Sequence, residues 1–309
     1  MAADEPGHHR HHEQGKGVAV GLVTYGIWGL LTIYWKQIEH FDAFELIGWR
    51  ITSAAAVMVL VLTVTRRLGD LGQVFGNRRT LRTVGLAAVL LTVNWTAYVW
   101  AVVHDHVLET ALGYFIAPLT TVTVGVVALH EPLRRAQKIA LAFAAASVVV
   151  LTISYGRVPL LALVIAASWT SYGFIKKGIS LSPTQSMASE SFVLVLPAIV
   201  TVIALAGRSD SIPHSASGLQ LGLAAATGIA TVVPLMMFAF AAHRVPLTII
   251  GPLQYLVPSM NFLIGWAMYH EPMPTDRLIG FALVWVGLIV FTVDSGLRVR
   301  RQTRNGPPR

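Results

Sequence analysis

The chain has 309 residues, of which 54% are hydrophobic and only 12% are charged. A soluble domain usually carries about 25% charged residues, and no stretch here is polar for long enough to form one. The apolar residues form blocks of roughly 20 residues, each able to cross about 30 Å of hydrocarbon. The chain contains no cysteine, which excludes disulfides, thiol nucleophiles and Cys-ligated metals.

Residues 1–16 form a polar segment that includes four histidines, His8, His9, His11 and His12. The apolar run that follows is too long for a signal peptide, and no small-residue cleavage site ends it. A histidine cluster can bind metal, but a solvated, disordered tail is the interpretation we favour.

Ten transmembrane helices are predicted along the rest of the chain. The second is the most polar at its start, where Asp42, Glu45 and Arg50 interrupt the apolar run. The predicted spans are 17–35, 43–65, 83–103, 107–129, 136–154, 159–175, 184–206, 219–241, 247–269 and 278–295.

Lys and Arg residues gather in alternate joints between these spans. If both termini are cytoplasmic, the outer joints hold only Lys36, Arg157, Arg208 and Arg277 of the 23 basic residues. This distribution follows the positive-inside rule and predicts an even number of spans. The net charge of +8 is therefore attributed to membrane topology and not to a nucleic-acid partner.

The two halves of the chain resemble each other. Residues 129–133 (LHEPL) resemble residues 269–273 (YHEPM), 140 positions later. Similar offsets pair Pro118 with Pro258, Phe115 with Tyr255 and Trp28 with Trp169. Since five spans separate equivalent positions, the second half is expected to lie upside down relative to the first, as in many secondary transporters. The expected units are 17–154 and 155–295, followed by a basic tail, 296–309.

Polar residues near the middle of a span are candidates for a solute site, because they are costly in lipid. Asn94 and Tyr98 share a face of the third span, and Trp95 lies beside them. They are expected to line a pocket with one amide, one hydroxyl and aromatic walls. The alternative is that Asn94 bonds a neighbouring helix and the aromatic rings are packing.

Pro118 and Pro258 lie near the midpoints of the fourth and ninth spans. Each removes a backbone hydrogen bond and displaces the carbonyl four residues earlier, at Tyr114 and Gln254. Paired helix breaks at corresponding depths point to a transporter site. Gln254, Pro258 and Asn261 are expected to share one helix face. Two harmless kinks are the alternative.

Trp28 and Trp169 lie near the centres of the first and sixth spans, and each has a tyrosine three residues away, Tyr25 and Tyr172. A central tryptophan is less easily explained than an interfacial one. These rings could form walls for a planar or amphiphilic solute, or they could be core packing.

Arg50 and Glu190 occupy equivalent positions in the two halves, 140 residues apart. Both are candidate coupling residues, but the inverted repeat places them at different depths, so direct pairing is not expected. Glu190 is the only carboxylate well within a span and is the leading candidate for a proton carrier. A structural hydrogen bond is the alternative.

Two further motifs receive a structural interpretation. The Glu-Pro pairs at residues 131–132 and 271–272 are expected to form tight turns before the next helix. His104, Asp105, His106 and Glu109 resemble a metal site in composition, but adjacent positions point in different directions, so no metal site is predicted.

Several segments together resemble the RarD-type subfamily of the drug/metabolite transporter superfamily, whose members contain EamA domains. The resemblance covers about residues 17–295 and is most specific in the third and fourth spans. It rests on Asn94-Trp95, residues 100–102 (WAV), Leu108-Glu109, residues 112–116 (LGYFI), Pro118-Leu119, residues 25–29 (YGIWG), Glu45, Arg50, residues 231–235 (TVVPL) and Gln254-Tyr255.

This resemblance implies a permease with two EamA repeats and a central cavity lined by spans 1, 3, 4, 6, 8 and 9. One departure is local, because His130 precedes Glu131 where relatives often have glycine. We therefore expect an all-α polytopic membrane protein of the bacterial inner membrane, with two inverted five-helix repeats and cytoplasmic termini.

The function we expect is secondary transport of a small organic solute, with protons as the candidate coupling ion and no cofactor. No Walker-type loop, HExxH or GxSxG motif is present, so an ATPase or an intramembrane enzyme is disfavoured. A non-transporting receptor or scaffold is the main alternative. The solute, the direction of transport and the oligomeric state stay open.

Overall fold

The computed structural model describes residues 6–129, 135–176, 178–242, 244–245 and 253–305, and helices are the regular structure found there. Eleven of the described helical elements correspond to predicted spans, because the described part of the ninth span contains α12 followed directly by a π-helix. They are α1 (Pro6–Lys36), α2 (Ala43–Val64), α4 (Arg78–Val103), α5 (Val107–Leu129), α6 (Arg135–Tyr155), α7 (Leu160–Lys176), α8 (Pro183–Ala206), α10 (Gly218–Ala242), α12 (Leu256–Leu263), the π-helix η1 (Ile264–Met268) and α13 (Thr275–Asn305).

The apolar character of these helices fits a membrane protein. Eight are long and apolar enough to cross a bilayer, and two shorter apolar helices cover 160–176 and 256–268. Large apolar side chains also point outward, among them Ile153 at 76% exposure and Leu196 at 69%. In water such exposure would be unfavourable, whereas in lipid it costs nothing.

Both predicted tails differ from the structure. The expectation of a disordered segment at 1–16 is wrong for residues 6–16, which continue α1, and residues 296–305 likewise continue α13. No proline interrupts either boundary, so an established helix propagates into the polar flank at little cost. The remaining tail residues lie outside the described part of the chain.

Two short helices were not predicted, α3 (Asp70–Phe75) and α9 (Ile212–Ser215). They lie in joints, where helices of four to six residues carry no apolar period that sequence reasoning could detect. The N-termini of neighbouring α2 and α4 are capped by the side chains of Asp42 and Asn77.

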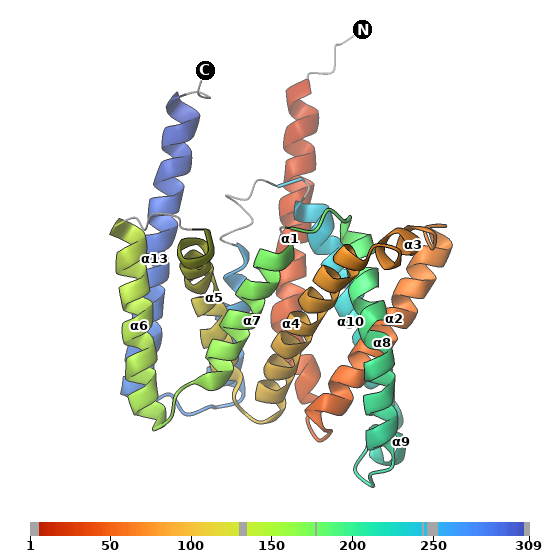
Figure 1. Ribbon diagram of the computed structural model, residues 1–309. Coiled ribbons are helices and arrows are strands. Elements are labelled where there is room, and N and C mark those ends of the chain that lie inside the picture. The colour runs from red at the N-terminus through yellow and green to blue at the C-terminus, as the bar shows by residue number, and fades with distance from the viewer. Residues whose placement is uncertain (1–5, 130–134, 177, 243, 246–252, 306–309) are drawn as a thin grey trace.

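The two halves run in opposite directions. Figure 1 shows the start of α1 and the end of α13 at one end of the bundle, which we call the terminal end. Helix α1 runs from this end to the opposite end, whereas α7, the first helix of the second half, runs the other way. This is the arrangement that an inverted repeat predicts.

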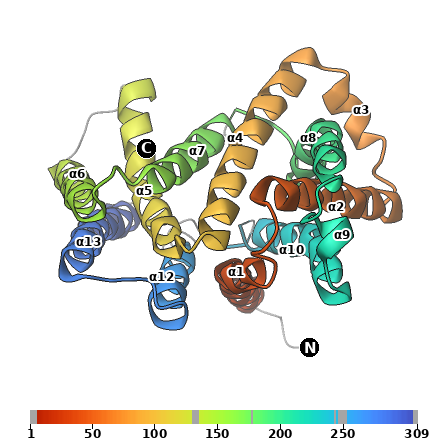
Figure 2. The same cartoon turned by 90° about the horizontal axis from the view of Figure 1, so that it is seen from below.

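Helices from both halves are mixed in the packing. Helix α2 packs against α8 and α10 at one edge of the bundle, and α6 packs against α13 at the other (Figure 2). Helices α1, α4, α5, α7 and α12 lie between these edges and contact one another. The polar residues of the middle therefore come from both repeats.

The contact between α2 and α10 is unusually close. A Cβ added at Gly228 would lie 2.3 Å from the carbonyl carbon of Ser53 and 2.5 Å from the nitrogen of Ala54. Only glycine fits such an approach of two backbones, which is a common device at helix crossings in membranes. The crossing brings Thr231 of α10 beside Arg50 of α2.

Candidate functional site

A buried chain of hydrogen bonds joins the two halves of the protein, close to the end of the bundle opposite the termini. Thr32 Oγ1 on α1 donates to Asn261 Oδ1 at 2.9 Å and lies 2.8 Å from the hydroxyl of Tyr98. Because a threonine has one proton to donate, the Tyr98 hydroxyl is the donor in the second bond. Asn261 Nδ2 then donates to Thr110 Oγ1 at 3.2 Å. The chain joins α1, α4, α5 and α12.

A second network centres on Asn94, whose side chain is fully buried. Its Nδ2 donates to the Ile165 carbonyl at 2.9 Å and to Ser168 Oγ at 3.2 Å, both on α7. Its Oδ1 accepts a hydrogen bond from the Tyr114 hydroxyl at 3.1 Å. In this conformation Asn94 thus bonds its neighbouring helices, and a role in a solute pocket stays a prediction.

Pro118 lies inside α5, as expected, and hydroxyl groups surround the adjacent backbone. The carbonyl of Ala117 accepts hydrogen bonds from Thr120 at 2.8 Å, Thr121 at 2.9 Å and Thr170 of α7 at 3.2 Å. The carbonyl that Pro118 displaces is that of Tyr114, so these bonds do not replace the lost one. They tie α5 to α7 of the second half beside the proline.

The expected face of Gln254, Pro258 and Asn261 is not formed. Gln254 is exposed and lies in a turn before α12, whereas Pro258 and Asn261 are buried. The helix begins at Leu256, so Pro258 falls in its first turn, where a proline needs no hydrogen-bond partner. The predicted helix break is therefore present, as a turn at Gln254 and Tyr255 four residues before Pro258, but the expected shared face is not. Residues 246–252 lie outside the described part of the chain.

The aromatic residues of the first span pack against α10. Trp28 lies 5.4 Å from the ring of Tyr25 and 5.6 Å from that of Phe238, measured between ring centroids. Tyr25 is buried and Trp28 is half-buried. The structure therefore brings this predicted pair together as one cluster.

A second aromatic row runs along α5 and α7. The ring of Trp169 lies 6.3 Å from Tyr114 and 5.9 Å from Tyr172, and Trp169 is 37% exposed. Tyr98 extends the row, at 6.1 Å from Tyr114. Tyr255 is separate from it and packs against the core between α5, α12 and α13.

Glu190 is buried and well supplied with partners. Its Oε1 lies 2.5 Å from Lys176 Nζ and accepts a hydrogen bond from Ser186 Oγ at 2.9 Å, and its Oε2 accepts one from the Tyr172 hydroxyl at 3.2 Å. The side chain of Lys176 is 26% exposed. The carboxylate is thus held as half of an ion pair near one end of the aromatic row.

Arg50 is buried at 5% exposure and has a different setting. Its Nε donates to Thr231 Oγ1 at 2.9 Å, and its guanidinium carbon lies 4.0 Å from the ring centroid of Trp95 and 5.5 Å from that of Trp35. As expected, Arg50 and Glu190 are not partners. Trp95, predicted as a pocket wall, contacts this cation.

Carboxylates hold the joints at the end of the bundle opposite the termini. Glu271 accepts hydrogen bonds from the backbone nitrogens of Val107 at 2.5 Å and Leu108 at 3.0 Å, which caps α5. Burial raises the pKa of Glu271, while these two hydrogen bonds act in the opposite direction. Glu271 thus lies in the joint before α13 but caps α5, and Pro272 precedes α13 instead of lying in its first turn as predicted. Residues 130–134 lie outside the described residues.

The side chains that resembled a metal site are dispersed among other partners. Asp105 pairs with Lys36, Glu109 pairs with Arg157, and the ring of His104 stacks on Trp100. In the described residues, no group of three or more His, Asp or Glu side chains is placed to hold a metal ion.

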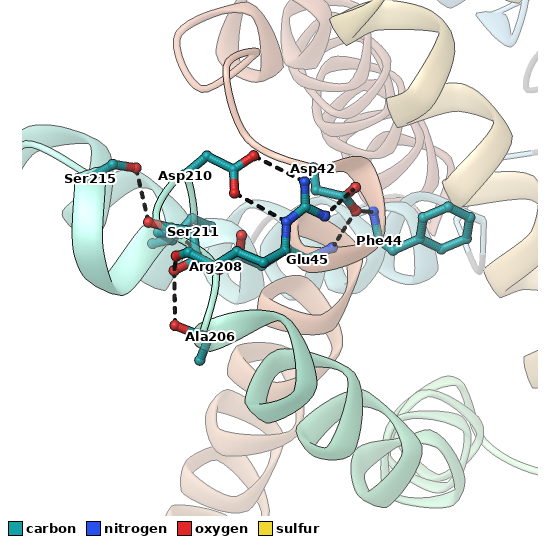
Figure 3. Close-up of polar contacts among 9 residues, drawn as sticks. Asp42, Phe44, Glu45, Ala206, Arg208, Asp210, Ser211 and Ser215 are labelled. Atoms are coloured by element: carbon teal, nitrogen blue, oxygen red, sulfur yellow. Dashed lines mark hydrogen bonds and ion pairs between the residues drawn. The ribbon is translucent and has the colours of Figure 1, made fainter.

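A further joint at this end links α2 to the loop after α8 (Figure 3). Glu45, at the start of α2, accepts a hydrogen bond from the nitrogen of Ile212 at 2.9 Å. Arg208 binds both carboxylate oxygens of Asp210 and reaches Asp42 at 3.5 Å. The two bonds from Arg208 hold the pKa of Asp210 below its ordinary value.

Two cavities lie beside α2, away from the buried amides. One, of about 300 Å³, lies between α2, α8 and α10, and the other, of about 480 Å³, lies between α2, α4, α7 and α8. Their linings are mainly apolar. The buried polar networks are closed by internal hydrogen bonds instead of bordering either cavity.

Sequence reasoning missed several buried hydroxyl residues, namely Thr32, Thr110 and Ser168, and it also missed Trp35. Thr231 entered only through the family resemblance and not as a candidate site residue. A serine or threonine in a membrane helix can bond its own backbone, as Ser168 does to the Val164 carbonyl at 2.5 Å. Its presence in a span is therefore no signal of function, and only tertiary contacts distinguish these hydroxyls.

Comparison with known proteins agrees with this architecture. The EamA-like transporter family matches the chain twice, over residues 15–153 and 157–293. These two matches correspond to the two halves of the internal repeat. A solved crystal structure with 18% sequence identity has a TM-score of 0.59 and covers 91% of this chain and 98% of its own, which shows a shared fold.

Several bacterial proteins are similar over nearly their full length. Protein RarD of Streptomyces exfoliatus is 41% identical over 294 residues, which covers 95% of this chain and 93% of the relative. The uncharacterized transporter YojE of Bacillus subtilis is 36% identical over 289 residues, with 92% and 95% covered. Protein RarD of Escherichia coli is 33% identical over 290 residues, with 94% and 98% covered.

Proposed function

Because this chain belongs to the EamA-like transporter family, we propose that it is a secondary transporter of a small organic solute, working by alternating access. The observation that carries this proposal is the buried chain of Thr32, Tyr98 and Asn261, which lies where the two halves meet. Polar groups at membrane depth mark solute pathways because lipid alone would penalise them. Two halves in opposite directions can exchange conformations.

The solute site we propose lies along these networks and the aromatic row. The amides of Asn94 and Asn261 now bond to protein hydroxyls and carbonyls, and a solute can take over those bonds when the helices separate. Exchanging one satisfied hydrogen bond for another costs little, whereas leaving the amide unpaired would cost about 1–3 kcal/mol. The other proposed lining residues are Tyr25, Trp28, Trp95, Tyr98, Tyr114, Pro118, Trp169, Tyr172, Gln254, Tyr255 and Pro258.

We further propose ten spans, with the terminal end of the bundle in the cytoplasm of a bacterial cell and the chain in its inner membrane. The lack of cysteine makes this easy to test. Ser209→Cys and Thr65→Cys place single thiols at exposed sites at opposite ends of the bundle. A membrane-impermeant maleimide should label intact spheroplasts at position 209 and not at 65, and the reverse pattern would invert the topology.

Glu190 is the proposed proton carrier. Its ion pair with Lys176 must open for protonation, and Ser186 and Tyr172 can keep the neutral acid hydrogen-bonded. Glu190→Gln mimics that neutral state permanently. We expect this variant to retain solute exchange but to lose uptake or efflux driven by a pH gradient, and retention of gradient-driven flux would exclude the role.

The transport proposal is tested with purified protein in liposomes. Flux of a labelled metabolite panel is measured with and without an imposed pH gradient, and Asn94→Ala is expected to impair flux of any transported solute. Absence of flux for every solute would favour a non-transporting receptor or scaffold. Chemical conversion of a solute without its movement would favour an intramembrane enzyme.

A further inference from the structure

Arg50 is a buried cation whose positive charge is not neutralised by the described part of the protein. No carboxylate there lies within 4 Å of its guanidinium, and its single hydrogen bond runs to the neutral hydroxyl of Thr231. Thr231 itself donates to the Thr227 carbonyl at 2.8 Å, so its proton is already used. A buried charge without a counter-charge is strongly unfavourable, which makes an additional anionic partner expected.

The contacts around Arg50 indicate which of its atoms a partner would bind once the helices separate. Trp95 covers a face of the guanidinium at 4.0 Å, and the ring of Trp35 lies 5.5 Å away. The guanidinium donors all lie in its plane, so rings over its faces leave the N–H edge for an acceptor. That edge geometry matches the two oxygens of a carboxylate.

A second group at this place also lacks a partner. The side chain of Trp35 is only 1% exposed, and its indole Nε1 has no hydrogen-bond acceptor among the described residues. An unsatisfied N–H donor beside an uncompensated cation is a combination that one anion would satisfy. The three nearby tyrosines, Tyr34, Tyr98 and Tyr114, all donate their hydroxyl protons to other acceptors.

The rings that continue from Arg50 indicate the rest of the ligand. Trp95 borders the guanidinium, and the row of Tyr98, Tyr114 and Trp169 leads away from it, with neighbouring centroids 6.1 and 6.3 Å apart. Aromatic faces bind flat apolar groups without directional polar contacts. A small inorganic anion would satisfy Arg50 but would use none of this surface.

We propose that Arg50 and Trp35 bind the carboxylate of an amphiphilic organic monoanion whose planar apolar body lies along the aromatic row. This inference rests on the proposed transport function and names the substrate class of that site. It assigns Arg50 to substrate binding, in place of the coupling role that its position in the repeat predicted.

A matched pair of probes tests the assignment on the wild-type protein. Binding of 2-naphthoate and of 2-naphthamide is measured by calorimetry and by thermal shift in detergent, since the two differ only in the charged group. We expect the carboxylate to bind at least about tenfold more tightly than the amide. Equal affinities, or no binding of naphthoate at millimolar concentration, would overturn the proposal.

Variants then locate the effect. Arg50→Gln should weaken naphthoate binding at least about tenfold and abolish the preference over the amide, and Arg50→Lys should recover part of it. Trp35→Phe keeps the ring and removes the N–H, so a smaller loss is expected. Arg208→Gln, at an exposed arginine, is the matched control and should bind as wild type. If Arg50→Gln still binds naphthoate more tightly than naphthamide, Arg50 does not bind the carboxylate.

Two further outcomes separate this inference from the transport function. If millimolar chloride or phosphate displaces naphthoate as effectively as naphthoate itself, the site binds any anion and the organic substrate class is wrong. If a solute is transported equally well by Arg50→Gln in liposomes, transport stands and the anion site fails. If naphthoate binds through Arg50 but no solute is moved, the site stands and transport fails.

Discussion

Arg50 and Glu190 occupy the same position in the two halves of one duplicated unit, yet their surroundings are opposite. Glu190 meets Lys176, Ser186 and Tyr172 within its own half, so its charge and both carboxylate oxygens are satisfied. Arg50 meets a neutral threonine from the other half and the faces of aromatic rings. Duplication therefore supplied equivalent positions, and later divergence made one self-contained and left the other incomplete.

The lysine that accompanies each position explains part of this difference. Lys176 binds Glu190, whereas Lys36, one residue from the corresponding place in the first half, binds Glu39 and Asp105 at the end of the bundle. A lysine directed at Arg50 would repel it, whereas one directed at Glu190 neutralises it. The same scaffold thus carries a closed ion pair in one half and an open cation in the other.

The largest expected change in stability comes from breaking the contact between α2 and α10, which places Thr231 beside Arg50. Gly228→Ala would force a methyl group into the backbone of α2 at Ser53 and Ala54. Because backbone atoms cannot rotate away, we expect a loss of about 3 kcal/mol in the free energy of unfolding. Unfolding in mixed micelles measures the change.

Gly222→Ala is the matched control for that variant. Gly222 lies on the same helix with open space around its Cβ position, so alanine there should be neutral or slightly stabilising. Equal stability of the two variants would show that the close crossing of α2 and α10 is absent in the folded protein.

Removing the ion pair between Glu190 and Lys176 should cause the next largest loss of stability. Glu190→Ala leaves Lys176 without its carboxylate in a mostly buried setting, and we expect a loss of about 2 kcal/mol. Replacing both residues together, by Glu190→Leu with Lys176→Met, should recover most of that loss. Additive losses in a double-mutant cycle would contradict a coupled pair.

The hydrogen bonds between the halves should contribute less to the free energy of unfolding than the ion pair of Glu190 and Lys176. Asn94→Ala removes the acceptor of Tyr114 and the bonds to α7, for which we expect a loss of about 1–2 kcal/mol together with impaired transport. Gln254→Ala is the comparison, since Gln254 is exposed and its loss should stay within about 0.5 kcal/mol. Equal losses of stability in the two variants would show that the hydrogen bonds of Asn94 do not stabilise the protein.

The smallest expected effect is a pH dependence at the joint capped by Glu271. Burial raises the pKa of Glu271 above the ordinary value of 4.5, so the folded state favours the proton. The stabilisation of the folded state by protonated Glu271 is fully present below pH 4.5, and it is lost as the pH rises through the raised pKa. Wild type should therefore lose stability relative to Glu271→Gln over that rise, by a Tm shift of at most about 2 °C. A constant difference across pH would show that Glu271 does not titrate there.

The sequence predicted the segments of the fold closely and the site only in part. The span expected at 107–129 coincides with α5, because a long apolar run between polar joints has one low-energy arrangement in lipid. Pro258 predicted the break at Gln254 and Tyr255, but not the exposure of Gln254, because a broken helix no longer keeps residues four apart on one face. Asn94 was recognisable because an amide in a span is rare.

Hydrophobic runs, basic joints and the repeated motif are local properties, so the chain alone determined an all-helical membrane protein made of two related halves. The sequence did not determine which residues contact each buried polar side chain. Whether Arg50 meets a carboxylate, a threonine or a ring depends on helices 181 residues apart in the chain, and a Gly228 contact sets their distance. Only the tertiary structure decided that Glu190 is neutralised within the protein and that Arg50 still has donors to offer.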